Sequence, residues 1–216
     1  MSKWNLLELT KLCEQKGLPI AKVYQNSLAW RWHRAGYHAD TASKIWSDLF
    51  KESPVSLGGT LFEEAAFSYE AQVEACVLSL HSLADILSQI INVVILGRRF
   101  KEDDVSIKRV LEVMEKEGIA PDVVKSTRGM IDDELFLYIE AFSNTIKHRR
   151  LINTEFRAEF GEKSRNESGL RFEEFIFKNR TYPQTWGSDI LKKYRLHVLD
   201  LITEVGLNIN RYIAAM

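Results

Sequence analysis

The sequence predicts a mainly α-helical protein: an up-and-down helical bundle with a β-hairpin inserted before its C-terminal helix. Three observations lead to this prediction. Residues 61–96 contain no glycine or proline and repeat apolar side chains at helical spacing. Residues 188–214 repeat apolar side chains at the same spacing. Between these stretches, residues 152–178 include two short runs in which apolar and polar residues alternate, a pattern typical of paired strands.

Shorter amphipathic stretches complete the predicted bundle. In the first part of the chain we expect helices at residues 6–15, 20–34 and 42–50, the last two separated near Gly36. After the long apolar stretch we expect helices at residues 103–117, 121–128 and 132–149. The last of these begins with acidic residues and ends with basic ones, which is the polarity that the helix dipole favours.

The predicted hairpin joins residues 154–160 to residues 170–177 through a polar, glycine-containing connection. We divide the chain near residue 57. Residues 1–57 form an N-terminal helical region rich in aromatic side chains, which we expect to pack on the core. Residues 58–216 form the bundle with its hairpin.

Composition narrows the classes of function. The chain of 216 residues has 29 basic and 30 acidic residues, so any nucleic-acid contact requires a local basic patch. Cys13 and Cys76 have no CxxC partner and are expected to be reduced and buried. The first residues lack the pattern of a signal peptide, so we expect a cytoplasmic protein.

The long apolar helix carries a polar stripe, in which His81 and Asp85 lie four residues apart on one face. Gln89 and Asn92 continue the stripe, and polar residues at this frequency argue against a membrane span. Internal hydrogen bonding between helices is one interpretation, and a catalytic or ligand-orienting role is a second. A metal site with Glu74 and His197 is a third, although we predict no metal or other cofactor because the chain has no metal-binding motif.

A second polar cluster lies at the end of the helix expected at 132–149. Asn144 and His148 fall on one helical face, and Lys147, Arg149 and Arg150 surround the imidazole with positive charge. Such a cluster suits a phosphate ligand. The alternative is a solvated basic helix end that complements the helix dipole.

The segment 142–149, Phe-Ser-Asn-Thr-Ile-Lys-His-Arg, resembles the signature of the HEPN superfamily, whose motif is Arg, a polar residue, three variable residues and His. The segment 80–87 resembles the earlier helix of uncharacterised bacterial HEPN-like proteins, in which polar residues face that motif. The resemblance covers about residues 61–148. It implies that Asn144 and His148 are the catalytic residues, that Lys147, Arg149 and Arg150 bind phosphate, and that His81 and Asp85 form a supporting polar wall.

The resemblance also implies a homodimer that binds or cleaves RNA, in a setting such as defence or a toxin–antitoxin pair. HEPN ribonucleases bring Arg and His of two protomers to one RNA phosphate and cleave without metal. Here Ser143 occupies the position of the motif Arg. Because a neutral hydroxyl cannot stabilise an oxyanion as a guanidinium does, Ser143 argues against cleavage. The alternative function is a non-catalytic module that binds a protein partner through the N-terminal region.

Overall fold

The computed structural model describes residues 4–50, 59–159 and 167–216. The chain folds into two compact units, each assembled from several segments. Unit 1 comprises residues 1–33, 80–137 and 197–216, and unit 2 comprises residues 34–79 and 138–196. The division that we expected near residue 57 falls in the segment 51–58, outside the described residues.

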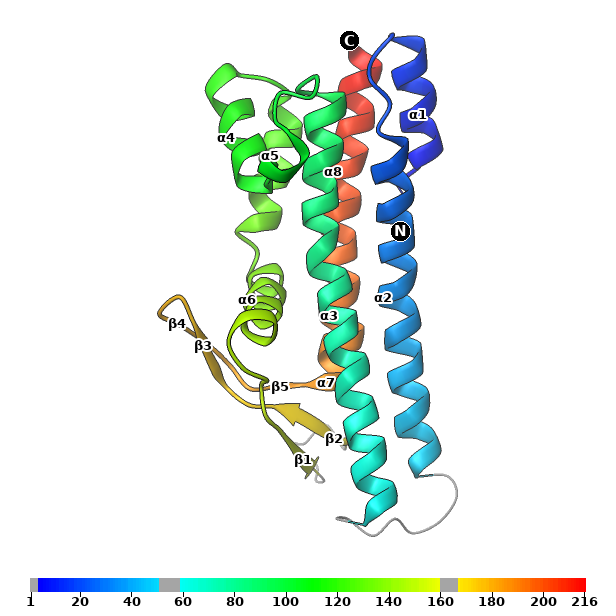
Figure 1. Ribbon diagram of the computed structural model, residues 1–216, viewed down its shortest axis with the longest axis vertical. Coiled ribbons are helices and arrows are strands. Elements are labelled where there is room, and N and C mark those ends of the chain that lie inside the picture. The colour runs from blue at the N-terminus through cyan, green and yellow to red at the C-terminus, as the bar shows by residue number, and fades with distance from the viewer. Residues whose placement is uncertain (1–3, 51–58, 160–166) are drawn as a thin grey trace. The chain divides into compact units, whose positions relative to one another are not determined.

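Unit 1 is helical. It contains α1 (Leu6–Gln15), the first part of α2 (Lys22–Leu49), the second part of α3 (Thr60–Val94), α4 (Ile107–Glu117), α5 (Pro121–Ile131), the start of α6 (Glu134–His148) and most of α8 (Arg195–Ala215) (Figure 1). A short 3₁₀ helix, η1 (Glu102–Asp104), precedes α4. Local signals set these boundaries: Asn5 caps α1, and α4 ends at Gly118, whose φ of 66° glycine adopts without strain.

The core of unit 1 forms around α3. Leu83, Leu87 and Ile90 on this helix are fully buried, as are Val205 and Ile209 on α8. Burying such side chains stabilises the fold by about 1.5–3 kcal/mol each. Trp4 also packs on α8. Its indole lies over Gly206, where a side chain would clash with the ring, and its N–H donates a hydrogen bond to the Asn210 side chain at 3.0 Å.

Unit 2 combines helices with two small antiparallel sheets. Its helical parts are the second part of α2, the first part of α3, most of α6, α7 (Gly187–Asp189) and the π-helix η2 (Ile190–Tyr194). In the first sheet β1 (Thr154–Glu159) pairs with β2 (Glu167–Phe172), and β2 pairs with β5 (Thr185–Trp186). The second sheet is a hairpin of β3 (Phe175–Phe177) and β4 (Arg180–Tyr182). Figure 1 shows these strands following α6.

The predicted mainly α fold with a β-hairpin before the C-terminal helix is confirmed, since β1 and β2 pair with Thr154 opposite Phe172. Two details of the prediction are wrong. Residues 22–49 form one continuous helix through Gly36. The neighbouring Ala35 and Ala39 are buried, and the Ala35 carbonyl accepts a hydrogen bond from the Cys76 thiol of α3 at 3.4 Å, so their small side chains allow close packing there. The strand expected at 170–177 divides into β2 and β3. The helical stretch expected at 188–214 is present, and the π-helix η2 lies near its start.

By length and composition alone, α3 could also cross a membrane. However, 67% of its most apolar stretch is buried inside the protein. A helix buried in a protein core can have the same length and hydropathy as a membrane span. Both cysteines are unpaired and buried. Burial raises the pKa of the Cys76 thiol to about 12, against a smaller opposing effect of the Arg195 charge.

Candidate functional site

The basic cluster predicted near the end of α6 lies at the protein surface of unit 2. The helix packs through Ile139 and Phe142, and Phe142 meets the ring of Phe172 at 5.1 Å between centroids. Beyond this buried face, the last turn of the helix extends into solvent. As a result Lys147 and His148, with the two arginines that follow, are all exposed.

Arg149 is held in place by the β3–β4 hairpin. Its guanidinium carbon lies 4.9 Å from the centroid of the Phe177 ring, and the Lys178 ammonium lies 5.0 Å from the same centroid. Lys178 is also 3.9 Å from a carboxylate oxygen of Glu140 on α6. The hairpin thus adds one cation to the cluster and orients another, and we call Lys147, His148, Arg149, Arg150 and Lys178 the basic surface.

Sequence reasoning missed Phe177 and Lys178, although a signal was present. Lys178 and Asn179 have φ values of 49° and 61° and connect β3 to β4 as a two-residue turn. Positive φ at both central residues defines a type I′ turn, in which Asn is a favoured residue. An apolar run followed by Lys-Asn therefore indicated a second hairpin. The contact between residues 149 and 177 depends on tertiary packing.

Asn144 and His148 occupy successive turns of α6, as predicted. The Asn144 amide donates a hydrogen bond to the Glu140 carbonyl of its own helix at 2.8 Å, so this nitrogen is engaged within the helix. His148 is exposed at the helix end. An exposed imidazole can meet a phosphate or a ribose hydroxyl that approaches from solvent, and it can accept or donate a proton there.

Ser143, at the position of the motif arginine, points into the interior of unit 2. It has no exposed surface, and its hydroxyl has no hydrogen-bond partner among the described residues. A guanidinium at this position would enter the apolar core. The arginines that directly follow α6, Arg149 and Arg150, are exposed.

His81 and Asp85 contact each other on α3, with 3.9 Å between the His81 Nδ1 and an Asp85 carboxylate oxygen. The His81 side chain is 16% exposed and the Asp85 side chain 67% exposed. Both belong to unit 1, whereas Asn144 and His148 belong to unit 2. The single cleft that would join the two pairs therefore stays a prediction.

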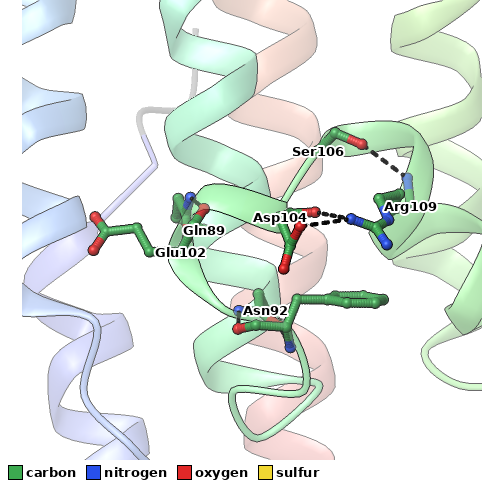
Figure 2. A network of polar contacts seen from close by, with 7 residues as sticks. Gln89, Asn92, Glu102, Asp104, Ser106 and Arg109 are labelled. Atoms are coloured by element: carbon green, nitrogen blue, oxygen red, sulfur yellow. Dashed lines mark hydrogen bonds and ion pairs between the residues drawn. The ribbon is translucent and has the colours of Figure 1, made fainter.

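The rest of the polar stripe on α3 fixes the connection to α4, as Figure 2 shows. Gln89 donates a hydrogen bond to the Glu102 carbonyl at 2.9 Å. The Asn92 amide donates to the Phe100 carbonyl at 3.0 Å and accepts from the Phe100 N–H at 3.1 Å. Arg109 then holds Asp104, and Ser106 caps α4. Gln89 and Asn92 are thus hydrogen-bonded to the backbone of Glu102 and Phe100, which follow α3, whereas the interpretation expected partners on other helices of the bundle.

A pocket of about 450 Å³ lies beside this network in unit 1. Its lining includes the cations Lys22 and Arg98, the carboxylate Glu102 and the phenol of Tyr24. Burial raises the pKa of Tyr24, and a hydrogen bond with Glu102 raises it further. Because cationic and anionic groups line the pocket together, its charge selects neither an anion nor a cation.

His197 lies 2.8 Å from an Asp133 carboxylate oxygen. The other Asp133 oxygen accepts hydrogen bonds from the N–H groups of Leu135 and Phe136 and so caps α6. Burial raises the pKa of Asp133, but the hydrogen bonds from His197 and the two backbone N–H groups outweigh it, and the net pKa is lowered. Among the residues that the structure describes, no three His, Cys, Asp or Glu side chains gather as a metal site.

The fold and surface together define a mainly α-helical protein with small antiparallel sheets and an exposed cationic surface at the end of one helix. No family model, no curated protein and no solved structure matches the chain.

Proposed function

We propose that the chain binds RNA through phosphate groups that contact the basic surface. The observation that carries the proposal is the exposed run of residues 147–150, in which Arg149 is held against Phe177 by the β3–β4 hairpin. The chain as a whole has a net charge of −1, so this concentration of cations is local. Phosphate contacts of Lys and Arg account for most non-specific affinity for nucleic acids.

The helix dipole offers a competing explanation for the basic residues. Cations at the C-terminus of an exposed helix gain about 0.3–1 kcal/mol each from the dipole. This effect explains why basic residues occur at the end of α6. It does not require the contact of the Arg149 guanidinium with the Phe177 ring, which restricts the positions that this side chain adopts. A guanidinium restricted in this way suits bidentate contact with a phosphate.

The experiment compares two double variants of equal charge change. Fluorescence anisotropy measures the affinity of the full chain for a labelled single-stranded RNA of about 20 nucleotides. We expect Lys147→Gln/Arg150→Gln to weaken binding about tenfold, because two phosphate contacts are lost. The control, Lys11→Gln/Lys16→Gln, removes two exposed cations from α1 and its C-cap and should leave affinity within twofold of the wild type. An equal loss of RNA affinity in both double variants would show that binding depends on net charge alone and not on the basic surface.

RNA cleavage is a stronger form of the same proposal. In the HEPN-type reaction the 2′-oxygen attacks the phosphorus, a His148 imidazole takes the 2′-proton, and the 5′-oxygen leaves with a proton from a second imidazole. This form requires two copies of the chain at one phosphate. We expect His148→Ala to abolish any cleavage while RNA binding persists. Cleavage that is unchanged in His148→Ala would exclude this mechanism.

A second candidate function is self-association through α2 in unit 1. Val23 is 73% exposed and Trp30 is 67% exposed, and their spacing of seven residues places them on one helical face. An exposed apolar stripe suits an isologous contact with a second copy. If so, sedimentation velocity should show a dimer that Val23→Ser/Trp30→Ser converts to a monomer. A wild-type monomer at concentrations of about 100 μM would rule out this contact as a stable interface.

A further inference from the structure

A second pocket, with a volume of about 180 Å³, lies in unit 2. Its lining comes from the last turns of α2, from α3, β2 and β5, and from the segment of α7 and η2. Three aromatic side chains form much of its wall: Trp46, Tyr69 and Trp186. None of the residues of the basic surface lines it, so the pocket is a separate feature of the unit.

The aromatic walls are held in position. Tyr69 and Trp186 are only 4% and 5% exposed, so Trp46, which is half-buried, offers most of the ring surface that a ligand can reach. The Trp46 ring lies 5.2 Å from the Tyr69 ring between centroids, and its indole N–H donates to the Ser168 carbonyl at 3.2 Å. The guanidinium of Arg171 lies 5.1 Å from the Trp186 ring. Rigid aromatic surfaces bind planar, aromatic ligands by stacking, as they do in proteins that bind single-stranded nucleic acids.

The polar groups of the lining define what else the ligand must carry. The hydroxyls of Ser43 and Ser47 donate to backbone carbonyls of their own helix, at 2.9 Å and 3.0 Å, which leaves each oxygen as an acceptor. Lys192 is the one cation in the described lining, and that lining contains no carboxylate. A matching ligand therefore combines a flat ring that bears N–H donors with an anionic group.

Lys192 lies within the π-helix η2. The π-turn is rare, is mostly a single-turn insertion in an α-helix, and occurs frequently at functional sites. One extra residue in the turn changes the direction of the side chains that follow it, by about 100°. The π-turn is thus a second observation that singles out this wall of the pocket.

We propose that this pocket binds a nucleoside monophosphate unit, with the base in the pocket against Trp46 and the phosphate at the exposed Lys192. The unit can be a free nucleotide or one unpaired nucleotide of a bound RNA strand. Only the second source rests on the proposed function. The base supplies the planar ring and exocyclic N–H donors, and the phosphate supplies the charge that Lys192 complements.

Two variants and a matched control test the proposal in the full chain. Lys192→Gln removes the cation of the pocket, and Lys193→Gln removes a neighbouring exposed cation of the same helix that does not line it. Gly169→Ala narrows the pocket without changing charge. The added Cβ would meet the Trp186 ring at 3.5 Å, an ordinary van der Waals contact, so the fold should accommodate it. Circular dichroism verifies that each variant is folded.

Calorimetric titration with AMP, GMP, CMP and UMP, and with ribose 5-phosphate as a probe without a base, gives the first result. We expect saturable binding of at least one nucleotide, weakened about tenfold in Lys192→Gln and in Gly169→Ala but unchanged in Lys193→Gln. Ribose 5-phosphate should bind at least about tenfold more weakly than that nucleotide. Equal binding of ribose 5-phosphate and the nucleotides would overturn the role of the aromatic walls.

The RNA affinity of the same variants separates the two sources. If no free nucleotide binds, a loss of RNA affinity in Lys192→Gln and Gly169→Ala, but not in Lys193→Gln, assigns the pocket to a nucleotide of the strand. If the wild type binds nucleotides but not RNA, the pocket stands and the proposed function fails. If the pocket variants change neither affinity, the pocket proposal is wrong, whatever the basic surface does.

Discussion

At the scale of single residues, Ser143 decides how the resemblance to the HEPN motif applies to this chain. Its hydroxyl is buried without a hydrogen-bond partner in the described part of unit 2. An unsatisfied buried hydroxyl costs about 1–3 kcal/mol. The sequence contained the signal for this burial, because Ser143 follows Ile139 by four residues and adjoins the apolar Phe142. Ser143 therefore lies on the buried face of α6 and cannot contact a phosphate directly.

An arginine at position 143 should destabilise unit 2 and should not create a nuclease. We expect Ser143→Arg to lower the free energy of unfolding by about 3 kcal/mol or more, since a charge and a long side chain would enter a packed core. Ser143→Ala, which removes the unpaired hydroxyl, should equal the wild type or exceed it by up to about 1 kcal/mol. Urea unfolding followed by circular dichroism measures both. A stable Ser143→Arg protein that gains RNA cleavage would contradict this placement of the residue.

At the scale of elements, Asp133 links the start of α6 to α8. Its lowered pKa means that folding favours the carboxylate. The resulting stability is fully present above the ordinary pKa of 3.8 and is lost as the pH falls through the lower pKa of the folded state. Asn at this position can still cap the helix but carries no charge for His197.

We therefore expect Asp133→Asn to be about 1 kcal/mol less stable than the wild type at pH 6. The difference between the two proteins should shrink as the pH falls below 3.8. Urea unfolding at a series of pH values measures this difference. Asp132→Asn, which removes the same charge one residue earlier, is the control. A constant difference between Asp133→Asn and the wild type from pH 6 to pH 3 would show that the carboxylate charge contributes nothing.

Elements with strong local signals could be predicted from the sequence. The bounds of α1 agree with the prediction, and Gly118 and Pro121 mark the end of α4 and the start of α5. The continuity of α2 through Gly36 could not be predicted, because buried alanines on the same helix offset the local cost of the glycine, about 1 kcal/mol. The break between β2 and β3 likewise follows from pairing with different strands.

The candidate site, too, could be predicted from the sequence only in part. The exposed cations at the end of α6 were predictable, since a basic helix end without apolar residues has no reason to be buried. The contact of Arg149 with the Phe177 ring was not predictable, because it depends on a turn at residues 178–179 that brings distant segments together. The aromatic pocket was also missed, since its walls come from residues 46, 69 and 186 and carry no common motif.

At the scale of the whole molecule, an almost neutral chain presents positive charge at one surface of unit 2. RNA binding through that surface is the central claim. If phosphates are the ligands, binding releases counterions, and the logarithm of the association constant falls linearly with the logarithm of salt concentration. The slope then reports how many phosphates the basic surface contacts.

The most direct test is the salt dependence of RNA affinity in the wild type and in Lys147→Gln/Arg150→Gln. For single-stranded RNA the slope is about −0.7 for each phosphate contacted. We predict a wild-type slope of about −2 or steeper and a slope shallower by about 1.4 in the variant, with Lys11→Gln/Lys16→Gln matching the wild type. RNA binding whose slope is the same in all three proteins, or no RNA binding at low salt, would contradict the account.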